Sequence, residues 1–255
     1  MHIFKLLEAR RQADLNVKVS AYSVIRDRYV GGDKDFYVSF TAINKLGNNP
    51  SSTYRTPLGI YSYPAWYVLK TVSPKTENMH ELPFAGDQPY VNLFNVSGNI
   101  VDVSNMSESD CMEYFKKLHD LYQDIEVDKV ISNSRTESRH SNIVGGRFWY
   151  VVREVARHLS GGKDKFGVKW NKAFRDLGID GCIDNGIGII HGIEPVQAVF
   201  FHKSVIRGVK SMDNKWEKYK TTDEHKISRQ VASARDIAGQ EYVPSKWEEY
   251  EDYYN

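Results

Sequence analysis

The sequence predicts an α+β protein, because strand-like segments lie towards both ends of the chain and helical segments lie between them. DFYVSFTAI (35–43) is rich in aromatic and β-branched residues, which are typical of strands. GGRFWYVVREVARHL (145–159) has the length and apolar content of a buried helix. Short strand-like segments separated by glycine-containing turns follow at 180–184, 188–191 and 196–201.

Composition excludes several classes of protein. The 255 residues include 34 Lys and Arg against 33 Asp and Glu, and 41% of them are hydrophobic, so the chain is neither disordered nor a histone-like polycation. No apolar run approaches the roughly 20 residues that span a bilayer, and the start, MHIFKLLEARRQADLN, has no signal-peptide core. The two cysteines, Cys111 and Cys182, indicate a reducing compartment, and we expect a cytoplasmic protein that makes no membrane contact.

The N-terminal half is expected to begin with an amphipathic helix in residues 3–15, followed by a short helix or strand in 20–30. After the strand at 35–43, residues 44–57 form a loop rich in Asn, Gly, Pro, Ser and Thr. Further strands are predicted at GIYSYP (59–64), at AWYVLKTV (65–72), and on both sides of Ser97-Gly98-Asn99 within 88–104.

The middle of the chain is predicted to be helical. Ser107 and Asp110 form a capping pattern before a helix at 111–123, and a shorter helix at 167–179 ends at Gly178. The polar segment 126–142 is interpreted as a loop, and a further helix is predicted within 225–239. We therefore divide the chain into an N-terminal helical segment (1–34), a main domain (35–212) and a charged C-terminal extension (213–255).

Standard catalytic motifs are missing from the sequence. It contains no Walker loop, GxSxG, HExxH or EF-hand loop, and the eight histidines show no metal-ligand spacing. Gly145-Gly146 lacks a preceding strand, which argues against a dinucleotide fold of the Rossmann type.

Three segments stand out in their order along the chain: YVSFT (37–41), TPLGIYSYP (56–64), and a third that runs from LGIDGCID (177–184) through GIIH (188–191) to EPVQAVFF (194–201). Each has an ordinary structural interpretation when taken alone, as a strand, a turn or a strand entry. In this order they resemble ADP-ribosyltransferase-like domains, especially those of phage-encoded polyvalent proteins. The resemblance implies a split β-sandwich of two small sheets with inserted helices and an NAD cleft between the sheets.

The chemistry of that family matches these residue types. Cleavage of the nicotinamide–ribose bond of NAD passes through an oxocarbenium-like transition state, which a carboxylate near the ribose stabilises, as in glycoside hydrolysis. An aromatic ring stacks on the nicotinamide, and backbone groups hold its carboxamide. The family's usual set is a His or Arg on the first strand, a Tyr or Ser in the second motif and a Glu in the third.

The resemblance implies a role for particular residues of this chain. Tyr61 takes the position of the stacking tyrosine, and Ser39 takes that of the first-strand His, with Thr41 two residues later. Gln197 takes the position of the catalytic Glu, and Glu194 lies three residues before it. The sequence therefore departs from the family pattern at Ser39 and at Gln197, where a neutral amide replaces the acid.

Three further residues complete the implied NAD site. Arg55 precedes the second motif and is a candidate partner of the NAD pyrophosphate, although a solvated loop arginine is an equally good interpretation. Gly59 and Tyr63 belong to the second motif itself. The sequence indicates no metal site.

Charge is unevenly distributed near the C-terminus. Residues 203–229 carry a net charge of +4, with Trp216 and Tyr219 interleaved, whereas residues 240–255 carry a net charge of −4. The basic segment is compatible with contact with a nucleic acid or another polyanion, and a solvated surface is the commoner meaning. We expect the acidic tail to mask the basic segment.

The implied function is transfer of ADP-ribose from NAD to a macromolecular acceptor, protein or nucleic acid, or hydrolysis of NAD, by a phage or bacterial effector that acts on host components. Two alternatives remain open. One is a catalytically impaired binding module that keeps the fold, which the missing His and Glu favour. The other is a virion-accessory protein whose role lies in assembly.

Overall fold

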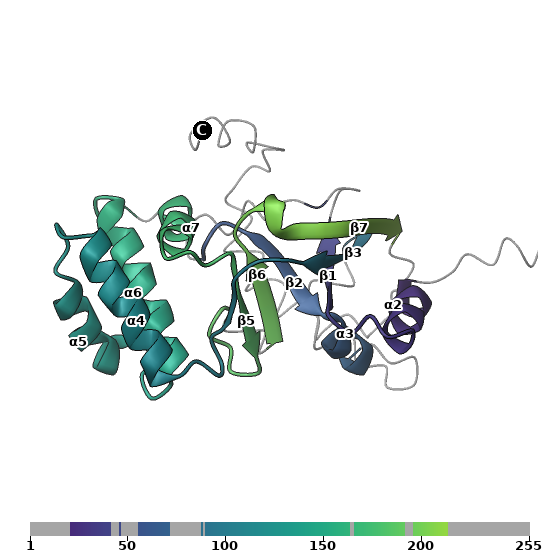
Figure 1. The fold of residues 1–255 in the computed structure, drawn as a ribbon, viewed down its shortest axis with the longest axis horizontal. Helices are drawn as coiled ribbons and strands as arrows, with labels where there is room; N and C mark the ends of the chain where they lie inside the picture. The colour runs from purple at the N-terminus through teal and green to yellow at the C-terminus, as the bar shows by residue number, and fades with distance from the viewer. Residues whose placement is uncertain are drawn as a thin grey trace, which may run out of the picture. The chain divides into compact units, whose positions relative to one another are not determined.

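The computed structural model describes residues 21–41, 46, 56–71, 88, 90–163, 166–191 and 196–213. All of them belong to the first of two compact units, residues 1–217, and the second unit is residues 218–255. The described residues confirm the α+β class, since they form both helices and a sheet (Figure 1). The helices predicted within 3–15 and 225–239 lie outside the described residues.

The described elements comprise strands of one mixed sheet and helices placed before, between and after them. The strands are β1 (Phe36–Thr41), β2 (Ile60–Pro64), β3 (Tyr90–Val96), β4 (Ile100–Asp102), β5 (Gly181–Asn185), β6 (Val196–Phe200) and β7 (Ile206–Asp213). The helices are α2 (Ala21–Val30), α3 (Ala65–Thr71), α4 (Glu108–Leu121), α5 (Val127–Glu137), α6 (Val144–Leu159) and α7 (Gly167–Asp176), with a short 3-10 helix at Lys203–Val205.

The strands form one seven-stranded sheet in the order β4-β5-β6-β2-β1-β3-β7. The pair β4–β5 is parallel and the other neighbouring pairs are antiparallel. Neighbouring strands in the sheet are therefore often distant in sequence, and β2 in the first half of the chain lies between β1 and β6. This order brings all three segments of the sequence resemblance into adjacent strands.

The sheet is strongly curved. The ring of Phe200 on β6 lies 4.8 Å from that of Tyr37 on β1 and 5.9 Å from that of Phe94 on β3, although β2 and β1 separate β6 from β3 in the sheet. Rings on non-adjacent strands meet in this way only across a concave face. That face buries a small apolar cluster which includes Leu46, Ile60 and Val205.

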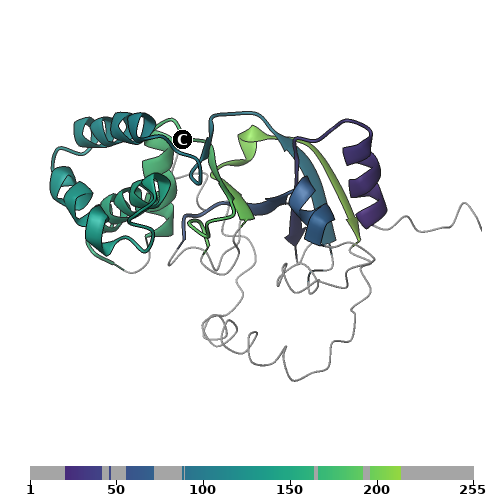
Figure 2. The same ribbon diagram turned by 90° about the horizontal axis from the view of Figure 1, so that it is seen from below.

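The opposite face of the sheet is covered by helices in two places. Helices α4 to α7 lie between β4 and β5 in the sequence and share the largest apolar cluster with Cys182 of β5 and Val199 of β6. Helices α2 and α3 share a second cluster with Val38 of β1 and Tyr63 of β2. Figure 2 shows α2 and α3 near one end of the sheet and the α4–α7 group near the other.

Local sequence explains where these helices begin and how they pack. Ser107 is the N-cap of α4, and its hydroxyl accepts the Asp110 N–H, as the capping pattern predicts. Gly145 allows α6 to approach the strand region closely, because a Cβ at this position would lie 1.7 Å from the Val103 carbonyl oxygen. Among the described residues, no helix is long and apolar enough to cross a membrane.

Several local predictions are wrong. Residues 65–71 form helix α3 rather than a strand, because Ala65, Val68 and Thr71 recur at helical spacing and are buried together. The segment 126–142 contains helix α5, which buries Val127, Val130 and Ser134 and exposes a polar face. Residues 188–191 form no strand beyond a single bridge at His191. The strand β7 was not predicted, because it is an exposed strand with few apolar residues.

Candidate functional site

Three neighbouring strands carry the candidate residues that the structure describes. Ser39 lies on β1, Tyr61 on β2 and Gln197 on β6, and β2 pairs with both other strands. Tyr61 pairs with Val199, and Ser62 pairs with Ala198. The sheet therefore places the three segments side by side although about 160 residues separate Ser39 from Gln197.

The strands β1 and β2 separate at the candidate site. Their registered pairs are Tyr37–Pro64 and Val38–Tyr63, and the ladder does not continue to Ser39. Instead, the Ser39 hydroxyl donates to the Tyr61 carbonyl oxygen at 2.9 Å. A side chain thus replaces a backbone hydrogen bond at the point where the two halves of the sheet diverge.

Strand alternation divides the candidate residues between the two faces of the sheet. Because Val38 pairs with Tyr63, and Tyr61 with Val199, the side chains of Tyr61, Tyr63 and Gln197 project to the helix-covered face. Ser39 and Thr41 project to the concave face. The structure brings the segments together but does not direct all of these side chains into one space.

Tyr61 is held firmly in place. Its hydroxyl donates to the Pro57 carbonyl oxygen at 2.7 Å, and its ring packs against the large apolar cluster beneath the helices. Burial raises the pKa of Tyr61 well above its usual value, so the phenol stays neutral at physiological pH. A ring fixed in this way serves the core, and the residue as a whole is partly buried.

The turn before Tyr61 is anchored to helix α7. Leu58 N–H donates to the Gly167 carbonyl at 3.1 Å, and the Asn171 side chain donates to the carbonyls of Leu58 and Phe201 at 2.6 and 2.7 Å. Gly59 lets β2 approach β6, since a Cβ there would lie 2.5 Å from a Val199 methyl carbon and 2.9 Å from the Phe200 carbonyl oxygen. This second-motif glycine is required by packing.

Tyr63 has a clear structural role. It is 5% exposed, and its ring lies 6.2 Å from that of Tyr67 and 6.1 Å from that of Phe40. It belongs to the apolar cluster that α2 and α3 cover. A ring enclosed in this way stabilises the fold rather than offering a surface to a cofactor.

Gln197 is buried on β6 opposite Asp184 of β5 and is 6% exposed. The fully buried Asp184 carboxylate accepts the backbone N–H groups of Gly186, Ile187, Ile189 and Ile190, which holds the turn after β5. Asp184 is therefore a structural carboxylate. Gln197 contributes an amide, not a charge, at the position that resembles the family's catalytic acid.

Sequence reasoning missed two polar residues on the concave face. Asn92 of β3 is fully buried, donates to the Thr41 hydroxyl oxygen at 2.8 Å and accepts from the Ser211 hydroxyl. Ser62 is 1% exposed, and its hydroxyl has no hydrogen-bond partner in the described part of the chain. Alternation in IYSYP was the available signal, because it places Ser62 on the opposite face from both tyrosines.

Two of the predicted site residues, Arg55 and Glu194, lie outside the described residues. The structure describes the other predicted site residues, which are Ser39, Thr41, Gly59, Tyr61, Tyr63 and Gln197. Across the ranges that the structure describes, no group of three His, Cys, Asp or Glu side chains is arranged to hold a metal ion.

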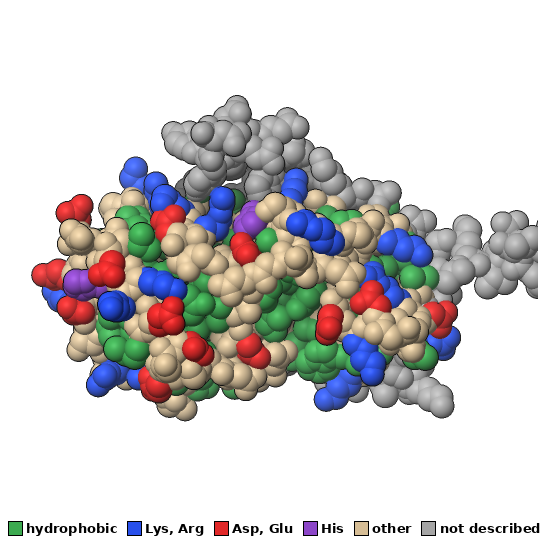
Figure 3. Space-filling view, in the orientation of Figure 1, with side chains coloured by type: hydrophobic (Ala, Val, Ile, Leu, Met, Phe, Trp, Pro, Cys, Tyr) green, Lys and Arg blue, Asp and Glu red, His purple; other side chains and the backbone are tan. Residues whose placement is uncertain are grey.

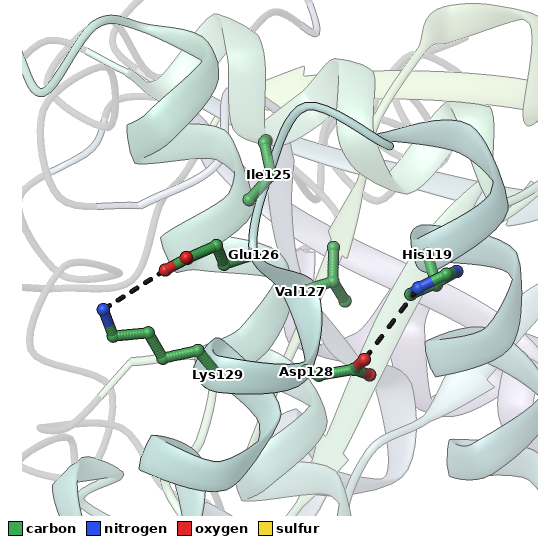
Figure 4. Close-up of a pocket in the computed structure, with 6 residues that line it drawn as sticks. All are labelled: His119, Ile125, Glu126, Val127, Asp128 and Lys129. Atoms are coloured by element: carbon green, nitrogen blue, oxygen red, sulfur yellow. Dashed lines mark hydrogen bonds and ion pairs between the residues drawn. The ribbon is translucent and has the colours of Figure 1, made fainter.

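A shallow pocket lies elsewhere, at the turn between α4 and α5 (Figure 4). It is lined by His119, Ile125, Glu126, Val127, Asp128 and Lys129. Lys129 pairs with Glu126 at 3.2 Å and His119 with Asp128 at 3.9 Å, and these side chains are mostly exposed. Exposed pairs of this kind contribute little to stability and show no catalytic arrangement.

Acidic and basic side chains are interspersed over the face drawn in Figure 3, which has no large patch of one sign.

Comparisons with known proteins identify no relative. No family model matches the chain, and neither the curated proteins nor the solved structures contain a match.

Proposed function

We propose that this chain is an ADP-ribosyltransferase-like domain that binds NAD and transfers its ADP-ribose to a macromolecular acceptor. One observation carries the proposal: the three segments of the sequence resemblance occupy the adjacent strands β1, β2 and β6, with Ser39, Tyr61 and Gln197 near the divergence of β1 and β2. The resemblance implies a cleft between two small sheets, whereas the described strands form one curved sheet in which the pairing of β2 passes from β6 to β1 near these residues.

Polar groups at this point support nucleotide binding. The Ser62 hydroxyl, which has no hydrogen-bond partner among the described residues, lies on the concave face with Ser39 and Thr41. A buried hydroxyl without a partner costs about 1–3 kcal/mol. A ligand that hydrogen bonds to Ser62 removes this cost. The nicotinamide carboxamide and the ribose hydroxyls of NAD are groups of the right kind.

Gln197 sets the expected rate. A glutamine accepts a hydrogen bond from a ribose hydroxyl, but it does not stabilise a positive oxocarbenium charge as a carboxylate does. We therefore propose slow cleavage of NAD by the natural chain. Glu194, three residues earlier, remains a candidate for the missing charge.

The same residues favour a second function, a binding module that keeps the fold without catalysis. The hydroxyls of Ser39 and Tyr61 both already donate to backbone carbonyls, and Gln197 is neutral. Such a module binds NAD or a related nucleotide and leaves its nicotinamide bond intact.

Labelled NAD distinguishes the two functions. We expect the full chain, mixed with bacterial lysate, to release nicotinamide. Where the nicotinamide ribose reaches the helix-covered face on which Gln197 lies, Gln197→Glu is expected to release nicotinamide about tenfold faster, because the variant supplies a charge at the ribose. Gln197→Ala is expected to be slower than the natural chain. Gln123→Glu, at an exposed turn position, is the matched control for the added charge.

The outcomes separate cleanly. Binding of NAD without nicotinamide release, even by Gln197→Glu, supports the binding module. Absence of both binding and release in the natural chain and in Gln197→Glu overturns the proposal.

A further inference from the structure

Asp180, His202 and Ser204 form a hydrogen-bonded relay beyond the proposed NAD site. Asp180 directly precedes β5, and the other two residues lie between β6 and β7. His202 Nε2 lies 2.7 Å from Asp180 Oδ1, and His202 Nδ1 contacts the Ser204 hydroxyl oxygen. Each ring nitrogen of one histidine therefore has one partner, a carboxylate on one side and a hydroxyl on the other.

The partners determine which nitrogen carries the proton. An ionised carboxylate only accepts hydrogen bonds, so Nε2–H of a neutral His202 donates to Asp180. Nδ1 is then the acceptor, and the Ser204 hydroxyl donates to it. This is the arrangement in which an imidazole acts as the base for a serine.

Asp180 is held as an ionised group. Partial burial works in the opposite direction, but hydrogen bonds from the Asn99 backbone N–H, at 2.8 Å, and from His202 lower the pKa of Asp180. Gly98 permits this approach, because a Cβ there would lie 2.5 Å from Asp180 Oδ2. The Asp180 carboxylate is thus held in place by the fold, in position to accept from His202.

Exposure fits a reaction at the surface. Ser204 is exposed, whereas the side chains of His202 and Asp180 are only 25% and 29% exposed. Arg207 lies in the same turn, where its guanidinium donates to the carbonyl oxygens of Ser204 and Ile206. Its positive charge lies beside the backbone carbonyl of Ser204 and has the sign that an oxyanion requires.

We infer that Ser204 is an activated nucleophile that takes the acyl group of small esters, with His202 as its base and Asp180 as a positioning residue. The Ser204 oxygen bonds to the carbonyl carbon while its proton moves to His202 Nδ1. The alkoxy group leaves with the electrons of its carbon–oxygen bond and receives that proton, which gives an alcohol and acyl-Ser204. Water then cleaves the acyl-serine ester with His202 as the base. This chemistry is independent of NAD.

The test uses the full chain with p-nitrophenyl acetate and with a fluorophosphonate probe. We expect release of p-nitrophenol, and a mass-spectrometric adduct on Ser204. Ser204→Ala is expected to lose labelling and at least about 100-fold in acylation rate. Asp180→Asn, which no longer fixes the required tautomer, is expected to lose at least about tenfold at an unchanged unfolding midpoint. Ser132→Ala, at another exposed serine, is the control and keeps the natural rate.

Two results overturn the inference. The first is that the fluorophosphonate probe leaves no adduct on Ser204 of the natural chain. This result can be interpreted without a variant. The second is labelling of Asp180→Asn at the natural rate, which shows that the relay only ties the start of β5 to the turn after β6.

Discussion

At the residue scale, several polar side chains around the candidate site satisfy backbone groups. Ser39 and Tyr61 donate to carbonyls, and Asp184 accepts backbone N–H groups within the turn after β5. These bonds fix the strands around the candidate site. A residue at a position that resembles a catalytic one therefore also has a structural role, and variants must separate the two.

Asp184 offers the clearest stability test at this scale. Asp184→Asn replaces one accepting oxygen with an NH₂ group that faces backbone N–H donors inside the protein. We expect the free energy of unfolding to fall by about 2 kcal/mol or more, measured by urea denaturation. Asp128→Asn, at a side chain that is 85% exposed, is expected to change it by less than about 0.5 kcal/mol. Equal effects of the two variants contradict the structural role of Asp184.

The lowered pKa of Glu154 predicts how the stability of the fold depends on pH. Its side chain is 8% exposed. Burial works to raise the pKa of Glu154, but the hydrogen bonds and charges of Arg153 and Arg157 prevail and lower it below the usual 4.5. A lowered pKa stabilises the folded state above the unfolded-state value, and this contribution is lost as the pH falls through the folded-state value. We therefore expect the melting temperature to fall as the pH drops below about 4.5.

Glu154→Gln tests the assignment. The variant is expected to melt at a lower temperature than the natural chain at pH 7, and the difference is expected to shrink as the pH falls below about 4.5. If the melting temperatures of the two chains differ by the same amount from pH 7 to pH 3, Glu154 does not contribute to the pH dependence of stability.

At the scale of elements, the sequence predicted those that have a local signal. The Ser107 cap identified α4, and the aromatic and β-branched run identified β1. Residues 65–71 were wrongly predicted as a strand, because a short run of Ala, Trp, Tyr, Val and Leu suits a strand or a helix. Packing against α2 and the sheet decides between the two. The helix α5 was missed because its polar face dominates its composition.

Gly59 tests how β2 and β6 hold the candidate site. Gly59→Ala places a Cβ against Val199 and the Phe200 carbonyl, so we expect a loss of about 1–3 kcal/mol in the free energy of unfolding and weaker NAD binding. A double-mutant cycle with Val199→Ala is the control. Because the smaller side chain relieves part of the collision, the two changes are expected to cost less together than their sum. Strict additivity contradicts this close approach.

At the scale of the whole molecule, strand order was beyond prediction from the sequence. The turn at 97–99 suggested neighbouring strands, yet β3 and β4 lie towards opposite ends of the sheet and β4 pairs with β5 after four intervening helices. Such pairing depends on long-range packing that no local pattern encodes. The relay of Asp180, His202 and Ser204 was missed for the same reason, since 22 residues separate Asp180 from His202.

The proposed function depends on this long-range arrangement. The sequence resemblance rests on three segments, and the sheet places them in adjacent strands. It also divides their side chains between two faces, which the sequence resemblance did not indicate. The proposal therefore depends on whether NAD binds to these strands and, if it does, on which face of the sheet.

An amide NMR titration of the full chain with NAD answers it most directly. We expect saturable shifts confined to β1, β2 and β6, with the largest near Ser39 and Ser62, and we expect these shifts to be lost in a Ser62→Val variant that keeps the natural unfolding midpoint. Saturating NAD that shifts no signal in these strands, or shifts only signals around the α4–α5 pocket, contradicts it.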